Sequence, residues 1–274
     1  MKADRQAPIG VFDSGVGGLT VVREIMRNLP DERIVYFGDT ARVPYGSKSK
    51  NTVIRYSRQI VHFLETQQVK AIVIACNTAS ALALDTIEKE IDLPIIGVVK
   101  PGAQMAVETT QNKRVGVIAT ESTIQSGLYQ QLITEADPVI TVYGKPCPLF
   151  VPLVENGYFN DGNPVTKLII AEYLQELKDA GVDTLILGCT HYPLLKKMIG
   201  DFMGDEVHLV DSGKVTAQAA AAALDDLGLL NGKKTGGTAR YFVSDTPDNF
   251  DELAHTFLGE YAGGTVERIA IETY

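Results

Sequence analysis

The sequence predicts an α/β fold made of two similar lobes, each with a mainly parallel sheet flanked by helices. Short apolar runs alternate with segments of helical periodicity along most of the 274 residues, as in repeated β-α-β units. These runs are continuous in apolar residues, as expected for parallel strands covered on both faces. A second series of units follows Pro101, so we expect two lobes.

The first series contains four expected strands between residues 9 and 99. They are IGVFDSG, IVYFGDT, AIVIACNT and PIIGVV. Apolar residues keep helical spacing from Leu19 to Leu29, where Pro30 ends the pattern, and again from Val53 to Leu64. A further helix is expected over residues 77–90.

The second series repeats this arrangement. Its expected strands are VGVIATES, ITVYGKP, TLILGCTH and VHLVDSG. Asn163 and Pro164 form a good cap and first turn for a helix that Gly181 ends. One face of this helix is expected to be lined by Val165, Leu168, Ile169 and Leu177. Residues 190–203 are expected to form one more helix.

The last part of the chain resumes with TAQAAAAALDDLGLL, which is a good helix former. A possible strand, RYFVSD, follows, and then a helix capped by Thr246 with Pro247 first, and the segment VERIAI. If this part returns to the first lobe, that lobe comprises residues 1–97 and 211–274, and the second comprises residues 98–210.

Composition excludes several classes of protein. The formal net charge is −9, with no cluster of basic residues beyond short pairs, so neither nucleic acid nor an anionic membrane surface is an expected partner. The N-terminus has no apolar signal segment, and no run approaches the roughly 18 apolar residues of a spanning helix. Three cysteines without a C-x-x-C pair favour reduced thiols in a cytoplasmic protein.

Two of the cysteines occupy equivalent positions. Cys76 and Cys189 each end the third strand of their series, 113 residues apart (189 minus 76). Ligands of parallel sheets bind at this end of the strands, and a thiol at a helix N-terminus is favoured as the thiolate. A single free cysteine is most often just a small buried side chain, and we assign that role to Cys147. The repeated position of Cys76 and Cys189 favours a function.

Two thiols that face one carbon from opposite sides suit an inversion reaction. One group removes a proton from one face, and the other delivers a proton to the opposite face. Lowering a thiol pKa from about 8.5 to about 7 gains only about tenfold in thiolate, so positioning and hydrogen-bond donors must supply most of the catalysis. Suitable donors for a substrate carboxylate are Ser14, Asn77, Thr78, Thr120, Thr123 and Thr190.

Seven segments together resemble the glutamate racemase family. They are GVFDSGVGGLTV, GDTARVPYGSKS, VIACNTAS, GVIATEST, FVPLVENG, LILGCTHYPLL and VDSG, in that family's order and spacing over nearly the entire chain. The resemblance implies racemisation of glutamate without a cofactor or metal, supply of D-glutamate for peptidoglycan, and a homodimer. It also implies two pseudosymmetric lobes with the active site in the cleft between them, the first lobe being completed by the C-terminal segment.

By this resemblance Cys76 and Cys189 are the proton-transfer residues, Asp13 tunes the first and His191 the second. The residues that hold the amino acid would be Asp13, Ser14, Tyr45, Gly46, Asn77, Thr78, Thr120, Thr123, Thr190 and His191. Glu155 matches a family acid near the site, with a role that the sequence does not define. The remaining alternatives for Asp13, His191 and Tyr45 are a helix cap, a buried histidine and a turn.

Three other functions remain open from the sequence. Aspartate racemase and related two-cysteine racemases share the superfamily. The glycines Gly15, Gly17 and Gly18, with Asp39 further along the chain, resemble a dinucleotide-binding site. However, Thr20 occupies the position of the third glycine in the G-x-G-x-x-G motif. A thiol-based metal or redox sensor would use both cysteines with His191, although a fourth zinc ligand is not evident.

Overall fold

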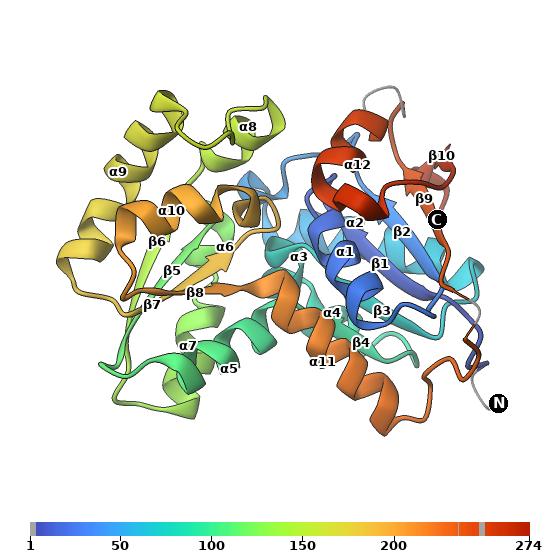
Figure 1. Cartoon of the computed structure of the whole chain (residues 1–274). Helices are drawn as coiled ribbons and strands as arrows, with labels where there is room; N and C mark the ends of the chain where they lie inside the picture. The colour runs from blue at the N-terminus through green and yellow to red at the C-terminus, as the bar shows by residue number, and fades with distance from the viewer. Residues whose placement is uncertain (1–3, 235, 247–249) are drawn as a thin grey trace.

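The computed structural model describes residues 4–234, 236–246 and 250–274. It contains two sheets that lie side by side, each covered by helices (Figure 1). Every strand pairing within the described residues is parallel. The predicted fold class is therefore confirmed.

The first sheet has six strands in the order β10-β9-β2-β1-β3-β4. Their bounds are β1 Ile9–Asp13, β2 Ile34–Gly38, β3 Ala71–Ile74, β4 Ile95–Gly97, β9 Ala239–Val243 and β10 Val266–Arg268. The central strand β1 pairs with β2 and β3, with Ile9 opposite Ile34 and Ala71. The last two strands come from the end of the chain and extend the sheet beyond β2 (Figure 1).

The second sheet has four strands in the order β6-β5-β7-β8. Their bounds are β5 Arg114–Ala119, β6 Thr141–Pro146, β7 Thr184–Gly188 and β8 His208–Asp211. This order repeats β2-β1-β3-β4 of the first sheet, strand for strand. The sheet order therefore favours a duplication, and we propose residues 1–97 with 211–274 and residues 98–210 as the two lobes because the strands divide in this way.

Helices cover both faces of the sheets. Their bounds are α1 Leu19–Asn28, α2 Lys50–Thr66, α3 Asn77–Leu82, α4 Leu84–Ile87, α5 Val99–Thr109, α6 Glu121–Gln125, α7 Leu128–Ala136, α8 Phe150–Glu155, α9 Pro164–Asp179, α10 Lys196–Met203, α11 Ser212–Asp226 and α12 Phe250–Leu258. In addition, α11 packs against α1 of the first lobe and α5 of the second, and the three helices lie along the junction between the lobes (Figure 1). No helix within the described residues is long and apolar enough to cross a membrane.

Alternate residues of the central strands serve two cores. Val11 and Val73 belong to a hydrophobic cluster that continues into the second lobe, whereas Phe12, Ile72 and Ile74 pack on the opposite face of the first sheet. Because successive side chains of a strand point to opposite faces, a continuous apolar run is buried on both.

Helix α9 begins as predicted, but its buried face is different. The Asn163 side chain accepts hydrogen bonds from the N–H groups of residues 165 and 166, and Pro164 is the first helical residue. The buried residues are Thr166, Ile170, Leu174 and Leu177, whereas Val165 is 46% and Leu168 is 72% exposed. The apolar face expected from the sequence therefore coincides only partly with the buried face, because apolar spacing alone does not say which side faces the sheet.

Two predicted helices are divided in the structure. Residues 77–90 form α3 and α4, with Ala83 between them. Residues 190–203 begin with the 3₁₀ turn Tyr192–Leu195, which contains Pro193, and the α-helix starts only at Lys196. The predicted helix start at Thr246 and Pro247 runs into residues 247–249, which lie outside the described part of the chain.

Candidate active site

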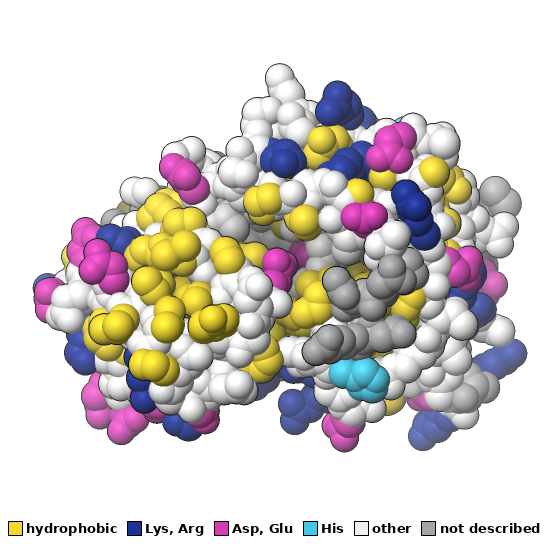
Figure 2. Space-filling view, turned by 90° about the horizontal axis from the view of Figure 1, so that it is seen from above, with side chains coloured by type: hydrophobic (Ala, Val, Ile, Leu, Met, Phe, Trp, Pro, Cys, Tyr) yellow, Lys and Arg dark blue, Asp and Glu magenta, His cyan; other side chains and the backbone are white. Residues whose placement is uncertain are grey.

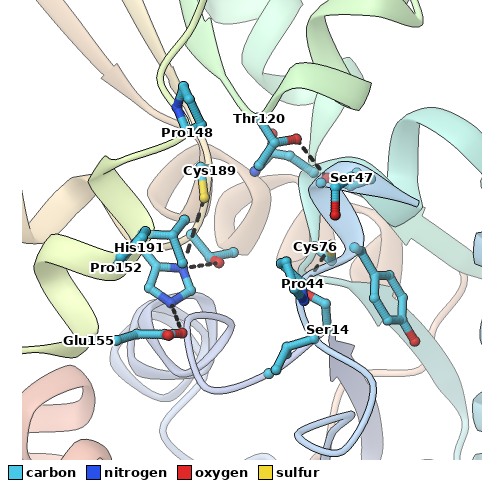
Figure 3. A pocket seen from close by; sticks show the side chains of 18 of the residues that line it. Ser14, Pro44, Ser47, Cys76, Thr120, Pro148, Pro152, Glu155, Cys189 and His191 are labelled. Atoms are coloured by element: carbon cyan, nitrogen blue, oxygen red, sulfur yellow. Dashed lines mark hydrogen bonds and ion pairs between the residues drawn. The ribbon is translucent and has the colours of Figure 1, made fainter. Parts of the chain in front are cut away.

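A cavity of about 360 Å³ lies at the carboxyl ends of the strands and is lined by residues of both lobes (Figure 3). From the first sheet come Ser14, which follows β1, and Cys76, which follows β3. From the second come Thr120, which follows β5, and Cys189, which follows β7. Its volume is at the small end of the range for ligand sites, about 300–1,000 Å³, so it suits a small metabolite.

Cys76 is the N-cap residue of α3. Its Sγ accepts from the N–H of Ala79 at 3.4 Å and lies 3.6 Å from Oγ of Ser14, to which it donates. Burial, reinforced by the nearby Asp13 carboxylate, raises the pKa of Cys76 to about 12, although the contacts with Ala79 and Ser14 act in the opposite direction. In the free protein Cys76 is therefore a protonated thiol at neutral pH.

Cys189 faces an imidazole. Its Sγ lies 3.9 Å from Nδ1 of His191, and Nε2 of the same ring lies 2.9 Å from Oε1 of Glu155 (Figure 3). Burial by itself lowers the pKa of His191, but the contacts with Cys189 and Glu155 outweigh it and raise that pKa to about 10. His191 is therefore a cation at neutral pH, and it can donate to Cys189.

The environments of the two thiols differ from the sequence prediction. A helix N-terminus was expected to favour the thiolate at both cysteines, yet at Cys76 burial outweighs the backbone donor. At Cys189 no α-helix begins until Lys196. The positive charge beside Cys189 comes from His191 instead.

Three threonine hydroxyl groups from the two lobes lie within hydrogen-bond distance of one another. Oγ1 of Thr78 lies 2.9 Å from that of Thr120 and 3.2 Å from that of Thr123, and the last two are 2.9 Å apart. Thr78 and Thr120 line the cavity, as do Asn77 and Thr190. Thr123 is not among the lining residues and lies behind Thr120, so it can act on a ligand through its neighbours.

Asp13 is also outside the lining of the cavity. Its Oδ2 accepts from the N–H of Gly15 at 3.0 Å, and its buried Oδ1 has no partner among the described residues. Burial raises the pKa of Asp13, whereas the His191 charge and the backbone N–H groups around Gly15 lower it. In the free protein Asp13 therefore contacts the turn after β1 and acts on Cys76 through its charge.

The predicted pair Tyr45 and Gly46 lies at the cavity in a 3₁₀ turn, Tyr45–Ser47. The hydroxyl of Tyr45 donates to the buried Asp39 carboxylate, and the carbonyl of Gly46 accepts from Ser122 of the second lobe at 2.8 Å. A Cβ atom at Gly46 would lie 2.7 Å from Cβ of Thr120. Only glycine allows this approach of the two lobes.

Several lining residues were missed from the sequence. They include Val43, Pro44, Ser47, Glu121, Cys147, Pro148, Val151, Pro152 and Asn156. Glu155, which the family resemblance had suggested near the site, also lines the cavity. Cys147 follows β6 at the carboxyl edge of the sheet, and this position could have indicated a place at the site, although the flanking prolines gave it a different sequence context from the other two cysteines. Its Sγ donates to the carbonyl of Lys145 at 3.6 Å. For the contact of Glu155 with His191, 36 residues away, the sequence carries no signal.

The glycine run after β1 serves contact between the lobes. A Cβ atom at Gly17 would lie 2.3 Å from Oγ1 of Thr190 and 2.4 Å from the His191 ring, and Thr20 donates to the carbonyl of Thr190 at 2.9 Å. The space next to Gly17 is therefore filled by protein, which argues against a dinucleotide phosphate there. No group of three potential metal ligands is found among residues 4–234, 236–246 and 250–274.

The chain is similar to known proteins in both sequence and fold. The family model of Asp/Glu/Hydantoin racemases matches residues 9–220. A glutamate racemase of Geobacter metallireducens is 50% identical over 264 residues, which cover 96% of this chain and 97% of that protein.

Solved structures of similar fold carry the same name. The glutamate racemase isoform RacE1 of Bacillus anthracis superposes with a TM-score of 0.92 at 37% identity, over 97% of this chain and 98% of that one. A glutamate racemase of Francisella tularensis, in complex with D-glutamate, gives 0.91 at 39% identity, over 98% of this chain and all of that one (100%).

Proposed function

Because the chain belongs to the Asp/Glu/Hydantoin racemase family, we propose that it is an isomerase that interconverts L-glutamate and D-glutamate without a cofactor. The single observation that carries this proposal is the position of the thiols. Cys76 and Cys189 follow strands of different sheets, and both line one cavity. The 50% identity to a glutamate racemase over nearly the whole chain favours glutamate as the substrate.

The mechanism that we propose uses one thiol on each face of the α-carbon. A thiolate removes the α-proton from one face, and the opposite thiol gives its own proton to the other face. The proton count balances, because the thiolate has moved from one cysteine to the other when the product forms. The reverse reaction restores the starting state.

Electrostatics of the free protein favour a particular starting state. Cys76 is held as a thiol by burial and by Asp13, whereas Cys189 faces the cationic ring of His191. In the mechanism that we propose, Cys189, which faces a cation, is therefore the first proton acceptor, and Cys76 is the first proton donor. After one turnover the arrangement is reversed, so substrate binding must bring positive charge or hydrogen bonds to Cys76.

We propose that short polar side chains, rather than lysine or arginine, hold the two carboxylates of glutamate. The described lining contains no lysine or arginine, and the whole chain is anionic. Hydroxyl, amide and backbone N–H donors of both lobes remain available at the cavity: those of Ser14, Gly46, Asn77, Thr78, Thr120 and Thr190.

The decisive experiment follows the circular dichroism of L-glutamate and of D-glutamate with the purified protein after removal of pyridoxal phosphate and metals. The circular dichroism signal of both solutions is expected to decay to zero, because each ends as the same mixture of L- and D-glutamate. Aspartate and other amino acids are tested in parallel, because an aspartate racemase is the nearest competing function. Racemisation of aspartate but not of glutamate would contradict the proposal. Racemisation of neither amino acid would contradict it as well.

Two further features are proposed from the resemblance. One is a cytoplasmic role in supplying D-glutamate for peptidoglycan. The other is a homodimer, for which a surface of exposed hydrophobic side chains over α8 and α9 is available (Figure 2). It includes Leu149, Tyr158, Val165 and Leu168. Light scattering that gives a mass of 29.7 kDa, rather than twice that value, contradicts the dimer.

A further inference from the structure

A buried hydrogen bond joins the two lobes directly behind the cavity. The hydroxyl of Tyr129, on α7 of the second lobe, donates to Oδ1 of Asn77 at 2.7 Å. Asn77 belongs to the first lobe and directly follows Cys76. Both side chains are almost fully buried, so this bond is not in competition with bulk water.

The direction of this hydrogen bond is set by Tyr129. Burial raises the pKa of its hydroxyl far above the usual range, and the nearby Cys189 adds to this effect, so the hydroxyl keeps its proton. It has no second acceptor among the described residues, and it therefore donates to Asn77. Only the carbonyl oxygen of the Asn77 amide can accept this proton.

The other end of the Asn77 amide is left without a partner. Its Nδ2 is buried and makes no hydrogen bond with any residue that the structure describes, although Asn77 lines the cavity. A buried donor without an acceptor is unfavourable, and a carboxylate oxygen is a strong acceptor for it. The free protein therefore presents an oriented donor whose partner is missing.

The ring of Tyr129 is itself held in place. A Cβ atom at Gly188, the residue before Cys189, would lie 3.4 Å from Cε2 of Tyr129, and one at Gly102 of α5 would lie 3.4 Å from its hydroxyl oxygen. The ring thus fits against the end of β7 and against α5. Its hydroxyl cannot turn away from Asn77 without displacing this packing.

We propose that Tyr129 is a positioning residue of the active site, which fixes the Asn77 amide with its N–H₂ group available to a substrate carboxylate. This inference rests on the proposed function, since it takes glutamate as the ligand. Without the Tyr129 hydroxyl, the amide can rotate by half a turn and present its oxygen to the carboxylate. The substrate carboxylate then loses a hydrogen bond and is repelled by the amide oxygen of Asn77.

The test measures the affinity for racemic glutamate by calorimetry in four proteins. They are the wild type, Tyr129→Phe, Asn77→Ala and the double variant. Tyr129→Phe keeps the ring and removes only the hydroxyl, and we expect it to weaken binding about two- to tenfold, as for loss of one hydrogen bond between uncharged groups. Asn77→Ala is expected to weaken it about ten- to a hundredfold, because its bond is to a charged group.

The double variant separates positioning from packing. If Tyr129 acts through Asn77, adding Tyr129→Phe to Asn77→Ala produces no further loss of affinity. The matched control is Tyr241→Phe, since Tyr241 is also buried and its hydroxyl has no partner among the described residues. This variant should bind glutamate as the wild type does.

The outcomes are distinct. Unchanged affinity in Tyr129→Phe, or losses that multiply in the double variant, overturns the role of Tyr129 while the proposed function stands. A wild-type protein that neither binds nor racemises glutamate overturns the proposed function instead. Because affinity is measured directly, variants that have lost turnover remain informative.

Discussion

Nε2 of His191 lies 2.9 Å from Oε1 of Glu155, and Glu155 approaches from the side of the ring that faces away from Cys189. The imidazole is therefore held between a carboxylate and a thiol. The negative charge of Glu155 is one of the causes that keep the pKa of His191 at about 10 despite burial. Glu155, which the sequence left without a role, thus acts on Cys189 through His191.

Replacing Glu155 with glutamine tests this relationship. Glutamine keeps an acceptor for Nε2 but removes the charge, so the pKa of His191 should fall. We expect kcat to fall about three- to tenfold at neutral pH, within the effect of one charge-assisted hydrogen bond, and the alkaline limb of the kcat profile to move to lower pH. The measurement is the pH dependence of kcat and KM in both directions.

Glu176→Gln is the matched control for this variant. Glu176 is an exposed carboxylate that pairs with Lys145, so the same change of charge occurs away from the cavity. Its pH profile should match that of the wild type. An alkaline limb that stays in place in Glu155→Gln would mean that Glu155 does not support the charge of His191.

Serine at either Cys76 or Cys189 should abolish racemisation. A hydroxyl is a far weaker base than a thiolate, and general acid–base catalysis contributes about 10²- to 10⁴-fold, so we expect turnover to fall by about 10³-fold or more in both directions. Affinity for glutamate should change by less than about threefold, because one small polar group replaces another. Circular dichroism and calorimetry measure the two quantities.

Cys147→Ser provides the comparison within the same cavity. Cys147 lines it, yet its Sγ donates to the carbonyl of Lys145, a bond that serine can also make. Its effect on turnover should be at least about ten times smaller than that of the other two substitutions, since it removes no proton-transfer group. Near-normal turnover in Cys76→Ser or Cys189→Ser would exclude the two-base mechanism.

Strand positions were predictable from the sequence, whereas the shape of some helices was not. Parallel strands are buried on both faces, so β3 and β7 stand out as apolar runs with a cysteine after them. Pro193 interrupts the helix expected after Cys189. Leu168 has the spacing of a core residue on α9 but is exposed, and only the packing of the helix shows which face is buried.

The same contrast applies to the site. Cys76 and Cys189 could be predicted because the chemistry sits at a fixed place in the strand order. The contacts of Glu155 with His191, and of Tyr129 with Asn77, join residues that are 36 and 52 positions apart. The first pair depends on how α8 packs against the turn after β7 within the second lobe, and the second pair depends on how the two lobes pack against each other. Local sequence patterns encode neither.

Gly17→Ala tests the contact between the lobes. The added methyl group would lie 2.3 Å from Oγ1 of Thr190 and 2.4 Å from the His191 ring, so the turn after β7 or the start of α1 must move. We expect a loss of stability of about 1–3 kcal/mol from overpacking and at least a tenfold loss of kcat, because a displacement of about 1 Å at a reacting group is costly. Chemical unfolding and racemisation assays measure these effects.

Gly200→Ala is the control for a glycine substitution. Gly200 lies within α10, and a Cβ atom there would make an ordinary contact of 3.6 Å with Leu209. Alanine should stabilise this helix by about 0.5–1 kcal/mol and leave kcat unchanged. If Gly17→Ala behaves like Gly200→Ala, the lobes do not need the close approach at Gly17.

The pH dependence of stability gives a final prediction for His191. Its pKa in the folded protein is about 10, against an ordinary value of 6.5, so the folded state binds this proton more tightly than the unfolded state. The resulting stabilisation is complete below about pH 6.5 and is lost as the pH rises through about 10. A pKa difference of one corresponds to about 1.4 kcal/mol, and we expect the free energy of unfolding to fall by more than about 1 kcal/mol from about pH 7 to about pH 10.

Urea unfolding across this range measures the effect, and His191→Gln identifies its source. The variant lacks the titrating ring, so its free energy of unfolding should vary less with pH below about pH 9. Cys76 contributes to the pH dependence only at higher pH, because its pKa is raised from 9.0 to about 12. Equal slopes in the wild type and in His191→Gln between about pH 7 and 9 would show that the imidazole is not held as a cation, and the proposed stabilisation of a thiolate at Cys189 would lose its basis.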